Sequence, residues 1–487
     1  MKTKNYLKSL IALSMVSLIS FSSCSSDSDN QPEVLAEGVI GNGDQEFIIK
    51  RDTVFKKGTY ELFGWVYVTE GTSVTFEPGC VIKGDKATKA ALIVEKGGKL
   101  IARGTASEPI VFTSSMAPGN RRPGDWGGLI LCGEGLNNKG TQIIEGGPRS
   151  THGGTKADDN SGVLSYVRVE FAGIPFAPDQ EINGITFGSV GSGTTVDHVQ
   201  VSYSGDDSFE WFGGSVNCKY LVAYHGWDDE FDTDNGYNGN LQFLLSVKNP
   251  RIADTSCSNG FESDNNSTAG TENPFTSPVF SNVTFVGPIG QDEAFVNDAS
   301  YITAGNINPD NGAKLGIFQA AMQIRRNSKL NCFNSVAMGY PVGIMLENDK
   351  GGTVQNWASN GDLSLKNNVF AGMTILGSDK NKSFKDQLST DASNLDETQS
   401  SFSSTFFLAQ GNKNLNAIAD LNLKQPNSLK SNANYGPMAG SPLLNAASFE
   451  DARLSGFDRV SYVGAFANEN DNWMAGWTNF DPQNTVY

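Results

Sequence analysis

The stretch 205–237 reads GDDSFEWFGGSVNCKYLVAYHGWDDEFDTDNGY, and a shorter related stretch at 258–266 reads SNGFESDNN. Together they contain three copies of one motif, in which an acidic residue directly follows a phenylalanine. Phe209 recurs as Phe231 after 22 residues, and Phe231 recurs as Phe261 after 30. A repeat of this length predicts a solenoid, in which each coil stacks on the one before it.

The acids of the repeat should form two columns on the outer surface, because successive side chains of a strand point to opposite faces. With the phenylalanines inside, Glu210, Asp232 and Glu262 share one outward column, and Asp234 and Asp264 lie beside it. Neighbouring coils lie about 4.8 Å apart, so two unpaired carboxylates would repel by about 3 kcal/mol at an effective dielectric constant of about 20. We therefore expect a bound cation along this row, or acids that keep their protons.

A second pattern in the same region has the same period. The apolar runs that contain Val199, Leu221 and Phe243 follow one another at steps of 22 residues. From Trp65 onward, short apolar runs alternate with glycine-containing turns, a pattern typical of many short strands and almost no helix. The 54 glycines and the 18% of charged residues are also typical of a turn-rich β protein. The sequence thus predicts an all-β solenoid of parallel strands.

Two further stretches near the start of this pattern point to a known architecture. They read EPGCVIKG at 77–84 and GGKLIARGTASEPIVFTS at 97–114, and GDWGGLI follows at 124–130. Their phrasing resembles the opening coils of right-handed parallel β-helix proteins of the pectate-lyase-like superfamily. The resemblance implies a right-handed parallel β-helix over residues 38–376. It implies no particular activity, because this fold supports many.

Two segments near the C-terminus depart from the coil pattern. Residues 377–430 are polar with helix-forming stretches, and we expect a partly helical insertion packed on the side of the solenoid. Residues 431–487 resemble the closing segment of Bacteroidota β-helix lipoproteins. We expect Trp473, Trp477 and Phe480 in this segment to cover the last coil, which would otherwise expose a strand edge.

The N-terminus resembles a bacterial lipoprotein signal. Three lysines precede an apolar run, Leu10–Ile19, that is too short to span a bilayer and is followed by Phe-Ser-Ser-Cys. The resemblance implies that residues 1–23 are removed as a signal peptide and that Cys24 is lipidated. Residues 24–37 would then form a flexible tether.

The acidic segment after Cys24, SSDSDN at 25–30, is similar to the export tag of Bacteroidota outer-membrane lipoproteins. That similarity implies a lipid-anchored protein on the outer membrane, exposed at the cell surface; the alternative is a polar tether only. No later segment is long and apolar enough to cross a membrane. Lipoproteins of this kind often work with an outer-membrane transporter, a partner that the sequence leaves open.

The formal net charge is −17, which becomes −20 once the three lysines before Cys24 are removed. A surface of this charge repels nucleic acid and anionic lipid, so neither is an expected partner. It would also repel a polyanionic glycan unless a divalent cation bridges the two. The five remaining cysteines include no CxxC pair, which argues against a zinc site, and a Cys218–Cys257 disulfide stays open.

The first functional hypothesis is a divalent cation site, with Ca²⁺ as the expected ion, because oxygen ligands at flexible spacing suit a hard cation. Its predicted ligands are Glu210, Asp232, Asp234, Glu262 and Asp264. The aspartate doublets at 206–207 and 228–229 lie where strands give way to turns. We expect those carboxylates to accept backbone hydrogen bonds at the coil corners.

An extracellular carbohydrate is the expected ligand of the groove beside the acids. Aromatic residues next to turns would offer flat faces to a sugar ring, and Trp227 and Tyr237 are the candidates. The main hypothesis is therefore a surface lipoprotein whose β-helix binds a cation and a glycan.

The first alternative is an enzyme, either a calcium-dependent polysaccharide lyase or a glycoside hydrolase. Pectate-lyase-like enzymes that cleave acidic glycans use acidic calcium ligands and an arginine or lysine as base, which implies Arg325 as the base here. Placing Ile324 and Ile344 opposite Phe261 would bring Arg325 near Asp264. A hydrolase would use paired aspartates instead, although the Gly-His-Gly and Arg-Ile-Lys strings of polygalacturonases do not occur. The second alternative is a non-catalytic structural or adhesive stalk.

Overall fold

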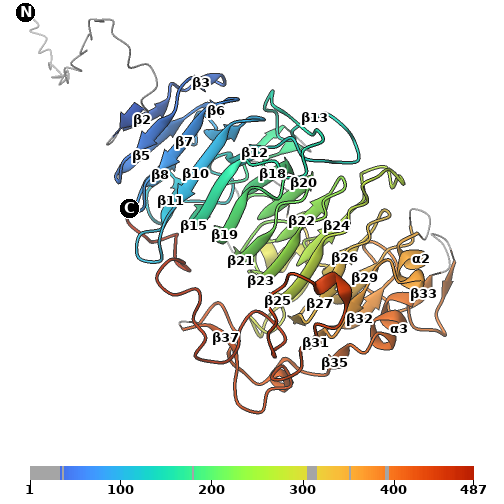
Figure 1. Cartoon of the computed structure of the whole chain (residues 1–487). Helices are drawn as coiled ribbons and strands as arrows, with labels where there is room; N and C mark the ends of the chain where they lie inside the picture. Colours follow the sequence, from blue (N-terminus) through green and yellow to red (C-terminus); the bar gives the residue numbers. More distant parts are fainter. Residues whose placement is uncertain are drawn as a thin grey trace, which may run out of the picture.

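Parallel strands stack into one long solenoid that occupies most of the chain (Figure 1). This computed structural model describes residues 33–35, 38–177, 180–303, 315–349, 353–389, 394–430 and 432–487. Within these ranges the strands of successive coils pair in parallel, and the antiparallel pairs are short peripheral hairpins. The predicted all-β parallel β-helix is confirmed.

Each coil contributes one strand to an eleven-stranded sheet, called sheet 2 below, whose strands follow one another in chain order. Its strands are β3 (Phe47–Ile49), β6 (Trp65–Val68), β9 (Ala91–Val94), β12 (Gly128–Cys132), β18 (Ile185–Val190), β20 (Phe209–Gly214), β22 (Phe231–Asp234), β24 (Phe261–Ser263), β26 (Ala320–Ile324), β29 (Val342–Leu346) and β32 (Ile375–Ser378). Because β20, β22 and β24 are neighbours, sheet 2 places the three copies of the acidic motif side by side.

The remaining strands of the coils form an eighteen-stranded sheet, called sheet 1. In the first coils it consists of two lines, β1 (Glu33–Leu35), β4 (Thr53–Phe55), β7 (Ser73–Phe76) and β10 (Lys99–Arg103), and β2 (Gly38–Gly41), β5 (Thr59–Phe63), β8 (Val81–Gly84) and β11 (Ile110–Ser114). Both lines join at the long strand β15 (Gly162–Glu170). The sheet continues through β19 (Thr195–Ser202), β21 (Cys218–Tyr224), β23 (Asn240–Val247) and β25 (Val279–Val286), and then divides again into β27 (Asn331–Phe333), β28 (Val336–Met338), β30 (Leu365–Lys366), β31 (Val369–Ala371) and β35 (Lys413–Leu415).

The interior of the solenoid is filled by alternate side chains of each strand, as the strand period requires. Phe209, Phe231 and Phe261 are fully buried and in register. The ring centroids of Phe209 and Phe231 lie 5.7 Å apart in a stacked arrangement. Burying one such ring is worth about 2 kcal/mol relative to leaving it in water, so this stack fixes the register of the acidic motif.

A line of residues in the left-handed backbone conformation bends the long strands of sheet 1. Tyr166, His198, Tyr220 and Phe243 have φ values of 53°, 50°, 56° and 61°. Their rings stack from coil to coil with centroids 4.4, 4.5 and 5.1 Å apart, and this stacking offsets the strain of the bend. In the next three coils asparagine, which tolerates this conformation, occupies the position: Asn282, Asn334 and Asn367.

The predicted strand spacing of 22 residues holds for one of its two steps. Val199 pairs with Leu221 as predicted, but Leu221 pairs with Leu244 and not with Phe243. Phe243 is instead the bend residue of its coil. The turn between β22 and β23 is one residue longer than the repeat predicts, and a turn can absorb an extra residue without disturbing the strands on either side.

The C-terminal segment 432–487 runs back along the outside of sheet 1, so that the chain ends near the first coils (Figure 1). Its large aromatic residues pack on sheet 1: Trp473 on Tyr220, Trp477 on Tyr166 and His198, and Phe480 on Tyr224. The prediction that these residues cover the last coil was wrong. Trp473 and Trp477 cover the aromatic bend line, which would otherwise expose apolar rings, and Phe480 packs on Tyr224 beside it.

The far end of the core is closed by residues that we expected to pack on its side. Helix α3 (Phe402–Ala409) contacts β29 and β32, and the ring of Phe407 stacks on Phe370 inside the core. Helix α2 (Thr353–Asn360) also buries two apolar side chains in this core. Because β35 then pairs with β31, the solenoid extends past residue 376 and the insertion acts as its cap.

The remaining elements are short and lie outside the two sheets. They are β13 (Gln142–Ile143), β14 (Thr151–His152), β16 (Pro175–Ala177), β17 (Gln180–Glu181), α1 (Ala299–Thr303), β33 (Leu388–Ser389), β34 (Leu395–Asp396), β36 (Leu423–Gln425) and β37 (Asn434–Pro437), with two 3₁₀ turns, η1 (Ile418–Leu421) and η2 (Ala452–Leu454). No helix in the described ranges is long and apolar enough to cross a bilayer.

The cysteines and the N-terminal predictions have different outcomes. The five cysteines of the described ranges are free and buried, so Cys218 and Cys257 do not pair. Cys24 and the predicted signal peptide lie outside the described residues. Residues 33–35, predicted as part of the flexible tether, form β1 and pair with β4, so the solenoid begins earlier than residue 38.

Candidate metal centre

The three acids predicted to share a column do so. Glu210, Asp232 and Glu262 are direct partners in the consecutive parallel pairings of β20, β22 and β24. The phenylalanine before each acid fills the core, so the carboxylates leave the opposite face of sheet 2. This alignment is confirmed, and the role of these acids as metal ligands stays a prediction.

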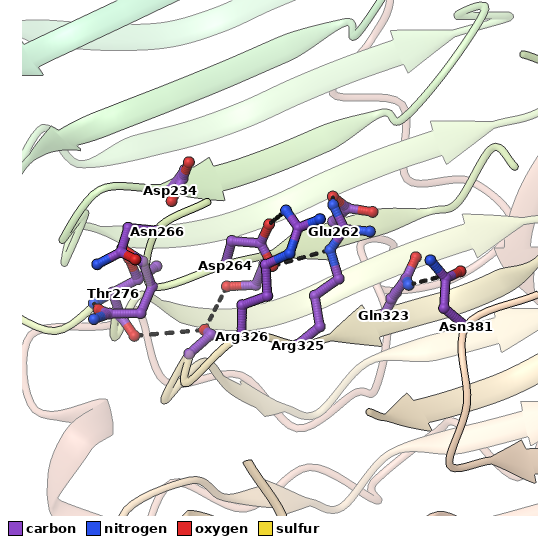
Figure 2. A network of polar contacts seen from close by, with 12 residues as sticks. Asp234, Glu262, Asp264, Asn266, Thr276, Gln323, Arg325, Arg326 and Asn381 are labelled. Atoms are coloured by element: carbon purple, nitrogen blue, oxygen red, sulfur yellow. Dashed lines mark hydrogen bonds and ion pairs between the residues drawn. The ribbon is translucent and has the colours of Figure 1, made fainter. Parts of the chain in front are cut away.

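The second column is also present, one step further along the strands. Asp234 is the last residue of β22, and Asp264 directly follows β24. The backbone N–H of Asp264 donates to the carbonyl oxygen of Thr233 at 3.0 Å, which sets Asp264 on the coil next to Asp234. Figure 2 shows the two carboxylates on successive coils.

The acids do not line an open groove. Glu210 and Asp207 are each 7% exposed. Loops outside the repeat cover the face: the amide of Asn183 contacts Glu210, and Nδ2 of Asn138 donates to the backbone oxygen of Asn265 at 2.7 Å. The expected solvent-facing row is therefore partly covered, with Glu210 and Asp264 buried and the other three acids half-buried. Strand alternation decides which face a side chain takes and not what covers that face.

Three carboxylates converge at the start of this row. One oxygen from each of Asp207, Glu210 and Asp232 lies within 4.8 Å of the other two. A second group, formed by Asp206, Asp207 and Asp228, shares Asp207 with the first. From the sequence, Asp207 was assigned to the coil corner and not to the predicted ligands, although its recurrence at the repeat step, as Asp229, placed it beside them.

Burial and mutual repulsion raise the pKa values of the first group well above their usual range. For Glu210 burial is the larger cause and the charge of Asp232 the next. For Asp207 burial is followed by Asp206, and for Asp232 burial is followed by Glu262. Among the described residues no ion pair reaches Asp207, Glu210 or Asp232, so their negative charge is not balanced by a lysine or arginine in contact.

Two buried oxygens beside these carboxylates lack a hydrogen-bond partner within the described part of the chain. They are Oδ1 of Asp232 and Oδ1 of Asn183. The Asn183 side chain is 1% exposed, and its Nδ2 contacts Glu210 and, at 3.3 Å, Oγ1 of Thr186. A buried oxygen without a partner costs about 1–3 kcal/mol, a cost that a bound cation would remove.

The aspartate doublets also build a ladder at the coil corner. Oδ1 of Asp207 accepts from the backbone N–H of Asp229 at 2.8 Å, and Oδ1 of Asp229 accepts from that of Asn259 at 2.5 Å. Oδ1 of Asn259 continues the ladder by accepting from the N–H of Ala320 at 2.9 Å. The predicted corner role of Asp207 and Asp229 is confirmed, and Asp207 combines it with a place in the carboxylate group.

A buried ion pair lies directly behind this corner, and the sequence analysis missed it. Lys248 and Glu230 are both fully buried, with Nζ and Oε1 3.5 Å apart. Nζ of Lys248 also donates to the backbone oxygen of Asp228. Ser208 donates to Oε2 of Glu230 at 2.5 Å. This pair anchors the 226–230 turn, and no repeat relates it to another coil.

The other end of the acid row has its own cations (Figure 2). Arg325 forms ion pairs with Glu262 and, at 2.9 Å, with Asp264, and Nη1 of Arg326 lies 2.6 Å from Asp264. The predicted proximity of Arg325 to Asp264 is confirmed, and Ile344 lies in the line of Phe261 as predicted, but the register given for Ile324 was wrong. Met322, and not Ile324, lies opposite Phe261.

The two aromatic residues proposed to stack on sugars cannot do so from their positions. Trp227 is 1% exposed, and its indole N–H donates to Asp254 at 2.8 Å. Tyr237 is fully buried, stacks on Trp211, and donates its hydroxyl to the backbone oxygen of Val216. The expectation of exposed rings was wrong, because both residues lie in turns that fold over the core.

A comparison with protein families agrees with the architecture. The family model described as "Pectate-lyase like beta helix domain" matches residues 47–420. Among solved structures, the chain is similar to the one titled "Crystal structure of pectate lyase Pel9A", with 16% identity, 86% of each chain covered and a TM-score of 0.36. No curated protein matches the chain.

Proposed function

The chain belongs to the pectate-lyase-like β-helix domain family, and from that premise we propose that its β-helix binds a divalent cation and an extracellular carbohydrate. The cation site consists of Asp207, Glu210 and Asp232. The observation that carries this proposal is the convergence of three carboxylates, those of the buried Asp207 and Glu210 and the half-buried Asp232, within 4.8 Å of one another, with which no described lysine or arginine forms an ion pair.

The donor set suits calcium. Calcium takes six to eight oxygen ligands at about 2.3–2.6 Å and tolerates irregular geometry. The three carboxylates offer it negatively charged oxygen ligands. Oδ1 of Asn183 adds a neutral oxygen beside them. The absence of cysteine and of accessible histidine in the group argues against a soft metal such as zinc.

The carbohydrate part of the proposal is supported by the family and by charge. A chain with a net charge of −17 repels polyanionic ligands, and a bound divalent ion would let an acidic polysaccharide approach this surface. The buried positions of Trp227 and Tyr237 leave polar and ionic contacts, rather than ring stacking, as the means of recognition.

The lyase alternative depends on Arg325 as a base, and its surroundings oppose that role. Burial disfavours the charge of Arg325, but the carboxylates of Glu262 and Asp264 outweigh burial and raise the guanidinium pKa well above its usual range. A general base must be unprotonated before it can accept a proton from the substrate. This arginine holds its own proton more firmly than usual, so its unprotonated form is rarer still. A binding protein is therefore the better account, and an enzyme would need another base.

We further propose that the protein is a lipoprotein anchored through Cys24 on the outer surface of the outer membrane. The support is the signal-like segment 1–23 and the acidic stretch that follows Cys24. A transporter in the outer membrane would be the natural partner for a surface glycan binder. Metabolic labelling with an alkyne fatty acid should label the wild type and leave Cys24→Ala unlabelled.

Calorimetric titration tests the cation site. Wild type, freed of metal with chelator, should bind calcium, and Asp232→Asn or Glu210→Gln should weaken binding at least tenfold because each removes one charged ligand. Glu450→Gln, at an exposed acid that pairs with Arg459, is the charge-matched control and should bind like wild type. Calcium binding that is unchanged in Asp232→Asn would contradict the assignment.

A pull-down on immobilised polygalacturonate tests the ligand. Wild type should be retained in calcium and released by chelator, and Asp232→Asn should pass through in both. Release of unsaturated sugar ends from the beads would favour the lyase instead. Equal passage of both proteins over acidic and neutral glycans would favour the stalk.

A further inference from the structure

The acid row consists of Asp207, Glu210, Asp232, Glu262 and Asp264, and its two halves differ in whether an arginine forms ion pairs with them. Asp207, Glu210 and Asp232 form the half without an internal cation, as described above. The other half contains Glu262 and Asp264, and there the guanidinium of Arg325 lies between the carboxylates (Figure 2). Both halves lie on the same face of sheet 2, and Asp232 and Glu262 are direct cross-strand partners.

Arg325 contacts two acids at once, as a metal ion would, and reaches from its own coil to both acids on the coil of β24. Its Nη2 pairs with Oε1 of Glu262, and its Nε lies 2.9 Å from Oδ1 of Asp264. The side chain is 15% exposed, so this contact is largely shielded from water. Arg326 differs, since it reaches only Oδ2 of Asp264 and its side chain is 27% exposed.

A third acid lies on the next coil beyond Arg325. The backbone N–H of Glu347 donates to the oxygen of Ile324 at 3.0 Å, which places Glu347 beside Arg325 across the sheet. Glu347 is 5% exposed, and its Oε2 is buried without a hydrogen-bond partner among the described residues. The charges of Arg325 and Asp264 act on this carboxylate, although no ion pair joins it to Arg325 within the described residues.

We infer that Arg325 is a built-in counter-ion that fills a second cation position, formed by Glu262 and Asp264 with Glu347 on the next coil, and so limits the protein to one exchangeable divalent ion. This inference rests on the proposed function for the location of that one ion. A guanidinium and a calcium ion both satisfy several carboxylate oxygens at once, and they cannot occupy the same space.

The inference makes Arg325 a determinant of ion stoichiometry. Replacing it with an uncharged side chain leaves Glu262 and Asp264 without their bridging cation, close to the buried Glu347 on the next coil. Their repulsion then favours uptake of a divalent ion in the space that the guanidinium filled. Replacing Arg326, which contacts one acid from the edge, should leave the bridging cation in place.

The experiment counts bound ions on the full-length protein without its signal segment. Terbium luminescence and equilibrium dialysis with radioactive calcium give the stoichiometry of wild type, Arg325→Met, Arg325→Lys and Arg326→Met. Wild type, Arg325→Lys and Arg326→Met should each bind one ion. Arg325→Met should bind one more than wild type, and this second ion should be lost in Arg325→Met combined with Glu262→Gln.

The outcomes separate this inference from the proposed function. No ion in wild type but one in Arg325→Met contradicts the Asp207–Glu210–Asp232 site and supports the role of Arg325. Equal stoichiometry in folded wild type and Arg325→Met overturns that role, whatever the wild type binds. If Arg325→Met is unfolded in chelator, calcium should restore its circular dichroism spectrum, and failure to do so also overturns the inference.

Discussion

At the scale of single residues, the sequence predicted which face of the sheet a side chain takes, but not whether that side chain is buried. The position of Glu210 outside the core follows from Phe209 beside it, because side chains alternate between faces. The same reasoning placed Glu210 in water, whereas it is 7% exposed. The cover comes from Asn183 and its neighbours, which belong to no repeat, so the sequence contained no period from which to infer them.

His152 offers a pH test of such a covered residue. It is 2% exposed, its Nδ1 lies 2.8 Å from Oγ of Ser189, and burial lowers its pKa to about 4. In the unfolded chain the imidazole takes up a proton near pH 6.5, whereas in the folded chain it does so only near pH 4. The contribution of the neutral His152 to the free energy of unfolding is therefore present above pH 6.5 and is lost as the pH falls toward 4. The loss amounts to about 3 kcal/mol at most.

Urea unfolding of wild type and His152→Gln at several pH values measures this contribution. As the pH falls from 7.5 to 5, wild type should lose more unfolding free energy than His152→Gln. Between pH 7.5 and pH 9 the difference between the two proteins should stay constant. A difference that does not change between pH 7.5 and pH 5 would show that His152 is protonated as easily in the folded protein as in the unfolded one.

At the scale of elements, the strands were predictable and their connections were not. The steps from Phe209 to Phe231 and on to Phe261 correspond to true cross-strand pairs because the same apolar side chain fills the same core position in each coil. Across the long insert before β26, counting residues no longer gives the strand register. Met322, and not Ile324, pairs with Phe261. Helix α3 was expected on the side because its two buried phenylalanines, Phe406 and Phe407, are too few to predict an end cap.

The attachment of α3 depends on one buried carboxylate. Asp379 is 1% exposed and accepts hydrogen bonds from the backbone N–H groups of Ser389, Phe402 and Ser403 and from the hydroxyl of Ser403. Asp379→Ala should destabilise this end by about 3 kcal/mol, because it leaves several buried donors unpaired.

Hydrogen exchange resolves the effect of Asp379→Ala. Amides of α3, β32 and β29 should exchange faster in the variant, and those of the first coils should not change. Asp396→Ala, at an exposed hairpin acid, serves as the control. Equal protection of α3 in Asp379→Ala and wild type would mean that other contacts, such as the packing of Phe407 and the hydrogen bonds to Asp386, hold the helix.

At the scale of the whole molecule, the C-terminal segment connects distant parts of the solenoid. Solenoids are stabilised mainly between neighbouring coils, so their ends can unfold separately. Here Trp477 is fully buried against the middle coils, and the hydroxyl of Tyr487 donates to Glu170 at 2.7 Å. Arg121 donates to the backbone of Pro482 and Thr485, which fixes the end of the chain to an early coil.

Removing residues 472–487 should make unfolding less cooperative. The truncated protein loses the ring of Trp477 from its core contact and leaves the buried Glu170 without its hydroxyl partner, for a combined cost of at least about 3 kcal/mol. Calorimetry should resolve more than one transition in the truncated protein and one in wild type. Tyr487→Phe should remain a single transition with a smaller loss. A single, unshifted transition after truncation would show that the segment is merely a cover.

The central claim concerns the Asp207–Glu210–Asp232 group and the ion that it binds. The most direct measurement is anomalous diffraction from crystals grown with calcium and with a calcium-free control. We expect one anomalous peak among Asp207, Glu210 and Asp232 that is absent from the control. We expect no peak between Glu262 and Asp264, where Arg325 lies. No peak among the three carboxylates at saturating calcium would contradict the claim.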